Sequence, residues 1–294
     1  MTLTRRRFLT LSAAAAGAAI ASPGAAAQTS WQGRAFGADV SLTLHGPRAV
    51  TGPALTMTRA LLRDVERCFS LYDPASLLVQ LNATGQLVPN DHMRALMQAA
   101  DLAHRITGGL FDPTVQPLWQ ALAAGTDPAS ARQAIGWERV QWSAQHIQLG
   151  RGQALTFNGI AQGYATDVIS AALEQAGLTQ TLVNIGEYRS SGGPWSLGLS
   201  DPQFGHMGNR TLVDGAIATS SPAATPIGPD GHILHTAAQP HWSTVSVEAK
   251  TATLADSLST ALVLAPLEQV RNIRRIAGVR RITLVGMDGD LITL

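Results

Sequence analysis

The order of hydrophobic patterns along the chain constrains its fold more than any other feature of the sequence. Helical spacing or a long apolar run marks four segments, 54–72, 92–109, 160–177 and 252–265. Alternating or β-branched character marks strands or hairpins at 36–46, 139–150, 181–186, 195–202, 243–249 and 281–294. These elements do not follow one another as regular βαβ units. The order therefore predicts an α+β fold with mixed sheets and packed helices.

The first 27 residues are predicted to be a targeting segment rather than part of the fold. The arginines Arg5 and Arg6 precede an apolar run over 11–21, and an Ala-x-Ala motif follows at 25–27. The run is too short for an ordinary membrane-spanning helix. The pattern resembles a twin-arginine export signal, which predicts cleavage after the motif, a single mature domain over 28–294 and a periplasmic location. An uncleaved N-terminal anchor is the alternative.

The charge balance gives no support for nucleic-acid binding. The chain has 21 Lys and Arg residues against 20 Asp and Glu residues, and three of the arginines lie in the predicted export segment. The remainder holds 18 basic against 20 acidic residues, so it has no excess of positive charge to attract phosphate backbones. The one cysteine, Cys68, has no partner for an internal disulfide and is expected to be a small core residue.

The apolar run 252–265 contains polar residues, of which Asp256 and Thr260 are the most informative. They are four residues apart, so on a helix they project from the same face. A carboxylate beside a hydroxyl offers hard oxygen ligands, which suit Mg²⁺ better than zinc. The alternative is an acid near a helix start, stabilised by the helix dipole, with a hydroxyl that bonds back to the helix.

Two other places are suited to nucleotide binding. Gly159 and Gly163 lie at a loop-to-helix transition, where free backbone N–H groups can bind a phosphate. Asp112 precedes a proline, which favours an extended or turn geometry, so its carboxylate can accept a hydroxyl or ring N–H. An ordinary helix start and an Asx turn are the respective alternatives. No histidine and cysteine cluster has zinc spacing, and neither G-x-S-x-G nor G-x-G-x-x-G occurs.

Seven strings in this order resemble the ApbE family, the FAD:protein FMN transferases, over roughly residues 34–290. They are FSLYDPASLLVQLN, GGLFDPTVQPLW, FNGIAQGYATDVISAALEQAGLTQTLVNIGEYRSSGG, WSLGLSDP, AIATSSP, HILHT and TATLADSLSTAL. The resemblance implies a fold related to the T-fold, with the FAD site in a cleft between lobes. It also implies a Mg²⁺-dependent reaction in which FAD is split, FMN is attached through its phosphate to a Thr or Ser of another protein, and AMP is released.

The resemblance implies roles for particular residues. Mg²⁺ would be held by the carbonyl of Gly159 and by Asp256, Ser259 and Thr260. The FAD site would include Phe36, Tyr72, Leu110, Phe111, Asp112, Thr156, Gln162 and His232. His232 is also the candidate catalytic residue, because an imidazole there can activate the acceptor hydroxyl.

Two departures from the family pattern bear on the activity. The usual string Asp-Leu-Gly-Gly-Ile-Ala-Lys-Gly-Tyr has Thr156 in place of its acid and Gln162 in place of its lysine. Gln162 and the string at 186–189 resemble a NosX-like branch, whose members mature nitrous oxide reductase. That implies a membrane-anchored acceptor flavoprotein with an exported domain. A protein that binds FAD without transferring FMN, or an FAD hydrolase giving FMN and AMP, are the alternatives.

Overall fold

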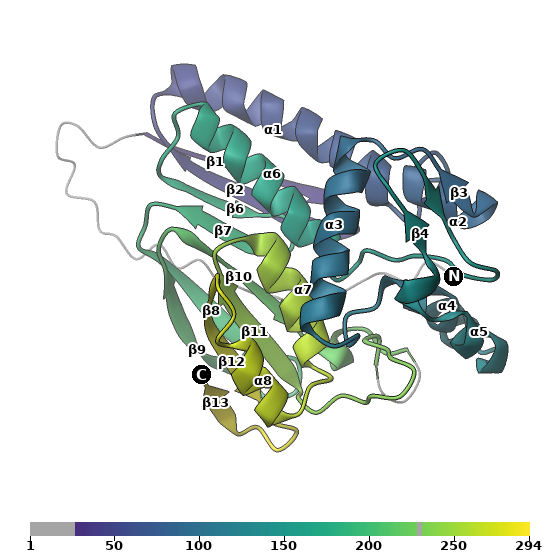
Figure 1. Ribbon diagram of the computed structural model, residues 1–294. Coiled ribbons are helices and arrows are strands. Elements are labelled where there is room, and N and C mark those ends of the chain that lie inside the picture. The colour runs from purple at the N-terminus through teal and green to yellow at the C-terminus, as the bar shows by residue number, and fades with distance from the viewer. Residues whose placement is uncertain (1–26, 228–230) are drawn as a thin grey trace.

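A computed structural model describes residues 27–227 and 231–294 (Figure 1). The predicted export segment lies, except for its last residue, outside these ranges, and its role stays a prediction. Within the described ranges, no helix combines the length and the apolar character needed to cross a membrane.

An eight-stranded sheet runs through the molecule, with its strands in the order β1-β2-β6-β7-β10-β11-β12-β13. Their bounds are β1 Gln28–Ala35, β2 Ala38–His45, β6 Thr181–Asn184, β7 Tyr188–Ser191, β10 Gly215–Ser220, β11 Thr244–Ala249, β12 Val279–Val285 and β13 Leu291–Thr293. Neighbouring strands are antiparallel throughout. This sheet with its helices confirms the predicted α+β fold.

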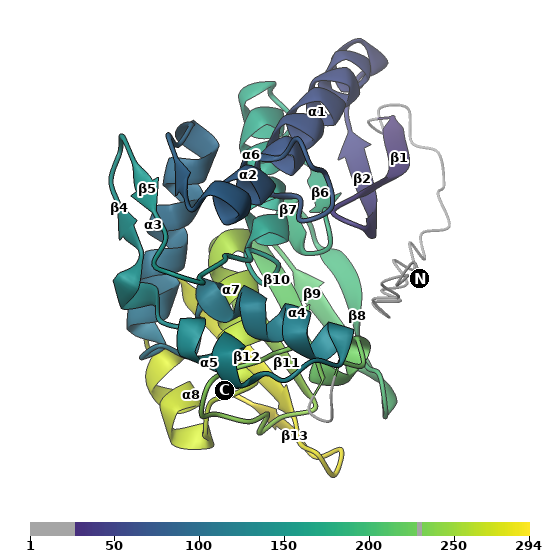
Figure 2. The same cartoon turned by 90° about the vertical axis from the view of Figure 1, so that its right-hand side faces the viewer.

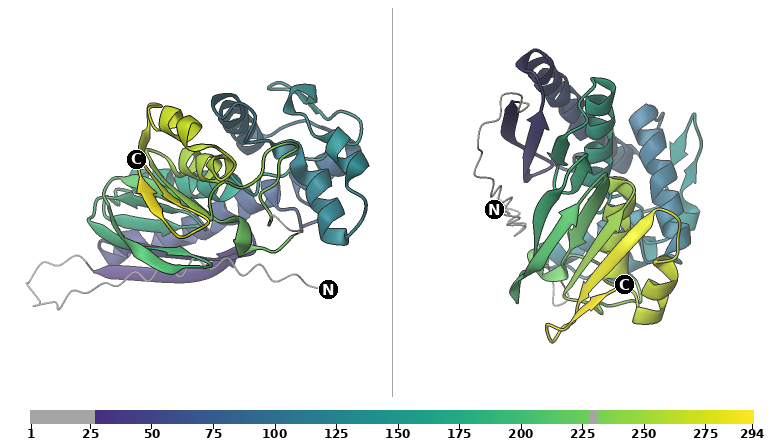
Figure 3. Two further views of the ribbon diagram at one scale, coloured as in Figure 1. Left: turned by 90° about the horizontal axis from the view of Figure 1, so that it is seen from below. Right: turned by 90° about the vertical axis from the view of Figure 1, so that its left-hand side faces the viewer.

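The two faces of the sheet pack against different elements. Successive side chains of a strand point to opposite faces, so alternate residues belong to different cores. On one face, Leu182, Tyr188 and Ile217 pack against the hairpin of β8 (Trp195–Asp201) and β9 (Gly205–Leu212). Residues that alternate with these, such as Val183, belong to the cores beneath the helices. Figure 3 shows α7 (Ala252–Leu262) and α8 (Leu267–Ile273) together over one side of the sheet.

The long helices bury regular apolar stripes. In α1 (Arg48–Phe69) the buried residues include Leu62, Val65 and Phe69, which are three or four positions apart. Cys68 is buried in the same helix, as predicted for a core residue. α1 packs against α6 (Ala161–Gln175), which also contacts β6, β7 and α7.

A second group of elements lies beside this layered body (Figure 2). Its helices are α2 (Leu77–Thr84), α3 (Asp91–Ile106), α4 (Gln116–Ala124) and α5 (Ala129–Ala134), and its 3₁₀ turns are η1 (Pro113–Val115) and η2 (Trp137–Arg139). Its small sheet has the order β3-β5-β4, with bounds β3 Gln86–Leu87, β5 Ile147–Gln148 and β4 Gln141–Trp142. The segment from α3 to α4 faces the ends of β10 and α7, and this junction forms the pocket described below.

The contact between α6 and α7 is unusually close. A Cβ atom at Gly163 would lie 2.3 Å from the carbonyl oxygen of Ala252 and 2.7 Å from the Cβ of Asp256. Asp167 of α6 accepts hydrogen bonds from the first N–H groups of α7, those of Ala252 at 2.9 Å and Thr253 at 2.8 Å. These N–H groups have no partner within their own helix, so Asp167 fixes the start of α7 onto α6.

Candidate active site

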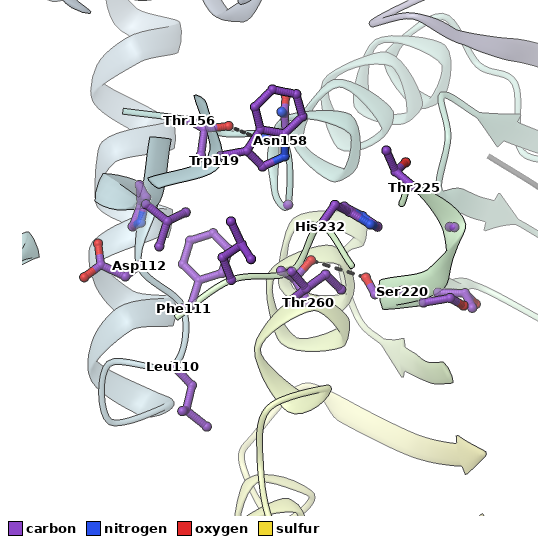
Figure 4. A pocket seen from close by; sticks show the side chains of 18 of the residues that line it. Leu110, Phe111, Asp112, Trp119, Thr156, Asn158, Ser220, Thr225, His232 and Thr260 are labelled. Carbon is purple, nitrogen blue, oxygen red and sulfur yellow. Dashed lines mark hydrogen bonds between the residues drawn. The ribbon is translucent and has the colours of Figure 1, made fainter. Parts of the chain in front are cut away.

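A pocket with about 1070 Å³ of empty space, open to solvent, lies where the second group of elements meets α7 and β10 (Figure 4). Its lining comes from five stretches of chain and from Thr260 of α7. The main lining residues are Leu110, Phe111, Asp112, Val115, Trp119, Thr156, Asn158, Gly159, Pro202, Thr219, Ser220, Ser221, Thr225, His232, Ile233 and Leu234. Apolar walls with a few hydroxyl groups and one imidazole are typical of a nucleotide or cofactor site.

The wall formed by Leu110 and Phe111 is held in place by a turn that Asp112 closes. The Asp112 carboxylate accepts hydrogen bonds from the Thr114 N–H at 2.8 Å and from the Thr114 hydroxyl at 2.6 Å. This is the Asx turn that the sequence offers as the alternative to a ligand contact at Asp112. Asp112 also lines the pocket, so the turn and a contact with a ligand are compatible.

The stretch before α6 lies next to this turn. The Thr156 N–H donates to the carbonyl of Pro113 at 2.8 Å, and the Thr156 hydroxyl accepts from the Asn158 N–H at 3.2 Å (Figure 4). The N–H groups of Ile160 and Ala161 both donate to the carbonyl of Phe157. The Gly163 N–H donates to Asp256 at 2.9 Å, so these three N–H groups are already paired within the protein.

Oxygen atoms gather around Thr260 at the floor of the pocket. A Cβ at Gly159 would lie 2.8 Å from the Thr260 hydroxyl oxygen, so only glycine lets the backbone approach α7 this closely. The Ser220 hydroxyl lies 3.3 Å from that of Thr260 and 2.8 Å from that of Ser259 (Figure 4). Ser259 donates to the carbonyl of Asp256 at 3.0 Å, so its own hydrogen points away from Ser220.

Asp256 is 2% exposed and lies one turn before Thr260. Its Oδ2 atom accepts a hydrogen bond from the Gly163 N–H at 2.9 Å. A buried carboxylate needs such compensation, and a backbone N–H is one part of it. The close contact between α6 and α7 is thus also the contact that stabilises this acid.

These residues fit a magnesium ion. The fit rests on the close approach of the Gly159 backbone to Thr260, which a Cβ would prevent, and on a donor set of carboxylate, carbonyl and hydroxyl oxygens, which hard cations prefer. Thr260 and Gly159 line the pocket, whereas Asp256 and Ser259 lie behind them. Within the described residues there is no group of three or more His, Cys, Asp or Glu side chains suited to a metal, so hydroxyl and carbonyl oxygens would have to complete the shell.

His232 projects into the pocket opposite the turn at 110–113 (Figure 4). Its Nδ1 atom lies 3.0 Å from the carbonyl oxygen of Pro222. Because a carbonyl only accepts, Nδ1 carries the hydrogen and in the neutral ring Nε2 is the basic nitrogen. This is the arrangement that a general base needs.

Three predicted FAD-site residues are not among those that line the pocket. Phe36 lies in the β1–β2 turn, where its N–H donates to Glu66 at 2.8 Å. Tyr72 follows α1 and is 65% exposed. Gln162 is 4% exposed, and its amide lies within 2.3 Å of where a Cβ on Gly186 would be, so it points toward the β6–β7 turn.

The sequence reasoning did not assign Trp119, Asn158, Ser220, Ser221 and Thr225 to the site, although all five line the pocket. Ser220 and Ser221 lie in the AIATSSP string, where two adjacent hydroxyls before a proline were the available signal. Trp119 belongs to GGLFDPTVQPLW and gave no signal beyond its apolar character.

The model of the ApbE family matches residues 36–280. Two similar proteins are named FAD:protein FMN transferase. The one from Rhodobacter capsulatus is 28% identical over 87% of this chain, and the chain spans 55% of that relative's length. The one from Klebsiella pneumoniae (strain 342) is 24% identical, with 88% of this chain and 84% of the relative covered.

Solved structures share the fold. The flavin transferase ApbE from Vibrio cholerae matches with a TM-score of 0.81 at 20% identity, covering 92% of this chain and 97% of its own. The ApbE protein from Thermotoga maritima also reaches 0.81, at 22% identity, covering 90% of this chain and 96% of its own. The family model extends over most of the chain, and the fold matches these solved structures: this chain belongs to the ApbE family.

Proposed function

We propose that this chain is a Mg²⁺-dependent FAD:protein FMN transferase. The observation that carries the proposal is the meeting, in one pocket, of the imidazole of His232 with the oxygen cluster around Thr260. The reaction would split the pyrophosphate of FAD, attach FMN through its phosphate to a Thr or Ser hydroxyl of an acceptor protein, and release AMP. The names of the relatives from R. capsulatus and K. pneumoniae support this activity.

The donor set around Thr260 would hold the metal. Asp256, Thr260 and the Gly159 carbonyl are the proposed ligands, and Ser259 and Ser220 complete the oxygen-rich surroundings. A magnesium ion bound there would neutralise charge on the pyrophosphate and polarise it for transfer. The buried carboxylate of Asp256 would in turn be compensated by the ion in addition to the Gly163 N–H.

The chain's own residues would position and activate the reactants. His232 is held by the Pro222 carbonyl and would take the proton of the acceptor hydroxyl on Nε2. The apolar side chains of Leu110, Phe111 and Trp119 would bind ring surfaces and exclude water from the transfer. Thr156 and Gln162 are neutral where the family has an acid and a lysine, so binding of FAD should depend less on salt than it would with that lysine.

Asp256→Asn tests the metal assignment. The variant keeps the size of the side chain and an oxygen acceptor for the Gly163 N–H but removes the negative charge. We expect the affinity for FAD to lose its dependence on Mg²⁺, measured by calorimetry with and without the ion. Asp39→Asn is the matched control, because its side chain is 96% exposed on β2. Unchanged metal dependence in Asp256→Asn would mean that the residue is only a buried acid near a helix start.

Incubation with FAD, Mg²⁺ and a candidate acceptor domain tests the reaction itself. Covalent flavin on the acceptor, seen by intact mass, supports the transferase. FAD recovered unchanged would instead indicate a flavin-binding protein, and free FMN with AMP would indicate a hydrolase. Thr156 and Gln162 replace the family's acid and lysine, and this is the reason for testing both alternatives in the same assay.

The proposed acceptor is a membrane-anchored flavoprotein of nitrous oxide respiration with an exported domain. Gln162 and the string at 186–189 are the residues that support this NosX-like assignment. The predicted division into an export signal at 1–27 and a transferase domain at 28–294 is consistent with it, because donor and acceptor must meet in the periplasm. Deleting the gene should leave that flavoprotein without FMN. Persistence of the FMN adduct in a strain without other family members would contradict the assignment.

The export signal has its own test. Replacing Arg5 and Arg6 together by lysine should leave precursor in the cytoplasm, because the receptor reads the arginine pair. Fractionation followed by immunodetection gives the readout. Normal export of the double variant would rule out the twin-arginine route.

A further inference from the structure

A chain of hydrogen bonds leads from a buried carboxylate to the wall of the pocket. Asp201 ends β8 and is 3% exposed. Its Oδ2 atom accepts hydrogen bonds from the Thr244 hydroxyl at 2.5 Å and the Ser243 hydroxyl at 2.7 Å. The Thr244 hydroxyl lies 2.6 Å from that of Ser221, which lines the pocket.

Asp201 is an acceptor only. Its Oδ1 atom accepts from the N–H groups of Gln203 at 2.7 Å and Phe204 at 2.9 Å, so both carboxylate oxygens carry two donors. Burial raises the pKa of this carboxyl, but the hydrogen bonds from Thr244, Ser243 and the two N–H groups outweigh burial and leave the pKa below its usual value. The group is therefore ionised under ordinary conditions.

An ionised acceptor fixes the direction of every bond that follows. A threonine hydroxyl has one hydrogen, and that of Thr244 is given to Asp201. In the bond between Thr244 and Ser221, Ser221 must therefore be the donor. Its hydrogen is given to Thr244, so toward any further partner the Ser221 oxygen can only accept. No other hydrogen bond joins the Ser221 hydroxyl to a residue in the described ranges.

We propose that Ser221 is a specificity residue that presents a hydrogen-bond acceptor to the pocket and selects a ring N–H of the bound nucleotide. Thr244 and Asp201 are positioning residues that prevent the hydroxyl from turning to donate. The inference rests on the proposed function for the identity of the ligand. Two N–H groups of FAD have the required chemistry: the amine of adenine and the imide N–H of the flavin ring.

The energetic basis is an asymmetry between ligands. A ligand N–H facing the Ser221 oxygen forms a hydrogen bond, whereas a carbonyl there would place two acceptors against each other in a half-enclosed site. A buried polar group that loses its partner costs more than a hydrogen bond contributes. We expect about a tenfold preference in affinity for the ligand with the N–H, which corresponds to about 1.4 kcal/mol.

The experiment compares FAD with two analogues by calorimetry in the presence of Mg²⁺. In one analogue hypoxanthine replaces adenine, so a carbonyl takes the place of the amine; in the other the flavin imide nitrogen is methylated. The wild type should prefer FAD about tenfold over one of the two, and that analogue identifies the ring at Ser221. Ser221→Ala should reduce this preference to about onefold.

Variants of Thr244 test the positioning. If adenine is the ring, Thr244→Val frees the Ser221 hydroxyl to donate, so the hypoxanthine analogue should gain about tenfold in affinity relative to the wild type. Thr244→Ser keeps the hydroxyl and should keep the preference whichever ring is bound. Thr51→Val is the matched control, because it removes the hydroxyl of another buried threonine, paired with Thr29 at 2.9 Å, and neither residue lines the pocket.

The outcomes separate this inference from the proposed function. Equal affinity of the wild type for FAD and both analogues, or a preference that survives in Ser221→Ala, would overturn the role of Ser221 while leaving the transferase in place. Failure of the wild type to bind FAD at all would overturn both. Thermal unfolding of each variant shows whether it is folded. If Thr244→Val does not fold, the affinities of Ser221→Ala alone test the role of Ser221.

Discussion

Replacing Gly163 by alanine should damage the site from behind, without removing any of its polar groups. The new Cβ atom would lie 2.3 Å from the carbonyl oxygen of Ala252 and 2.7 Å from the Cβ of Asp256. Ordinary van der Waals contact with a Cβ begins at 3.4 Å. The start of α7 would therefore have to move by about 1 Å, because the nearest atom is backbone and cannot turn away.

Two effects on the free energy of unfolding oppose each other. Exchanging glycine for alanine inside a helix stabilises by up to about 1 kcal/mol. Overpacking a close contact costs about 1–3 kcal/mol, and the backbone contact puts this case at the upper end. The net expectation is a loss of about 1–2 kcal/mol in the free energy of unfolding. The shift of α7 also moves Asp256 and Thr260, and a displacement of about 1 Å at a reacting group can reduce a rate by about 100-fold.

Urea denaturation and Mg²⁺-dependent FAD binding measure the two consequences. Gly52→Ala is the matched control, since Gly52 lies inside α1 and a Cβ there would meet nothing within 4 Å. This control should change the free energy of unfolding by less than about 1 kcal/mol, because the helical residue before Pro53 gains less from a Cβ than other helical positions, and it should keep full FAD binding. A Gly163→Ala protein that is as stable as the control would refute the reasoning, because it would show that α6 and α7 can move apart without a loss of stability.

Two further outcomes follow from other polar contacts. Asp167→Asn leaves only one oxygen for the N–H groups of Ala252 and Thr253, and it removes the charge that pairs with Arg189. Thermal unfolding should therefore show a loss of about 1–3 kcal/mol in the free energy of unfolding. An unchanged melting temperature would contradict the role of Asp167 at the start of α7. Burial lowers the pKa of His235 below its ordinary 6.5, so the folded state disfavours its charged form. The contribution of His235 to the free energy of unfolding is therefore complete above pH 6.5 and declines as the pH falls from 6.5 to the lowered pKa. Urea titrations at several pH values should show that His235→Asn reduces this dependence of the free energy of unfolding on pH.

The main helices could be predicted because their apolar period is local information. The segments 92–109 and 160–177 correspond to α3 and α6 within three residues, and 54–72 corresponds to α1, which begins six residues earlier. The compensation of Asp256 could not be predicted in the same way. Its partner, the Gly163 N–H, lies 93 positions earlier in the chain, and only the packing of α6 on α7 brings the two together.

Two of the strands that the patterns missed, β1 and β9, have polar sequences. β1 has exposed and half-buried residues in alternation, with one buried residue at its end, so no apolar face marks it. It is held by its pairing with β2 along all of its length. β9 likewise has one buried residue and is fixed by its register with β8. Such strands follow from their neighbours rather than from their own hydrophobicity.

Some site residues can be predicted from the sequence around them, whereas the role of others depends on residues far away in the chain. Leu110, Phe111 and Asp112 lie in one short string, and the turn that Asp112 closes brings them to the pocket together. The direction of the Ser221 hydroxyl follows only from Thr244 and Asp201, which lie on β11 and β8. Whether a hydroxyl donates or accepts depends on the other hydrogen bonds that its partner makes. The sequence around the hydroxyl does not contain this information.

The arrangement of the pocket assigns metal binding and ligand selection to different parts of the fold. The proposed metal ligands lie at the contact between α6 and α7, where Gly163 and Asp167 leave little freedom of movement. The ring walls and Ser221 lie mostly in connecting segments, at 110–115 and after β10, with Trp119 on α4, and all of them lie outside that contact. Substitutions at the helix contact should therefore alter metal dependence and stability together. Substitutions such as Ser221→Ala should alter the choice of nucleotide while leaving the free energy of unfolding nearly constant, because the connecting segments contribute less of the core.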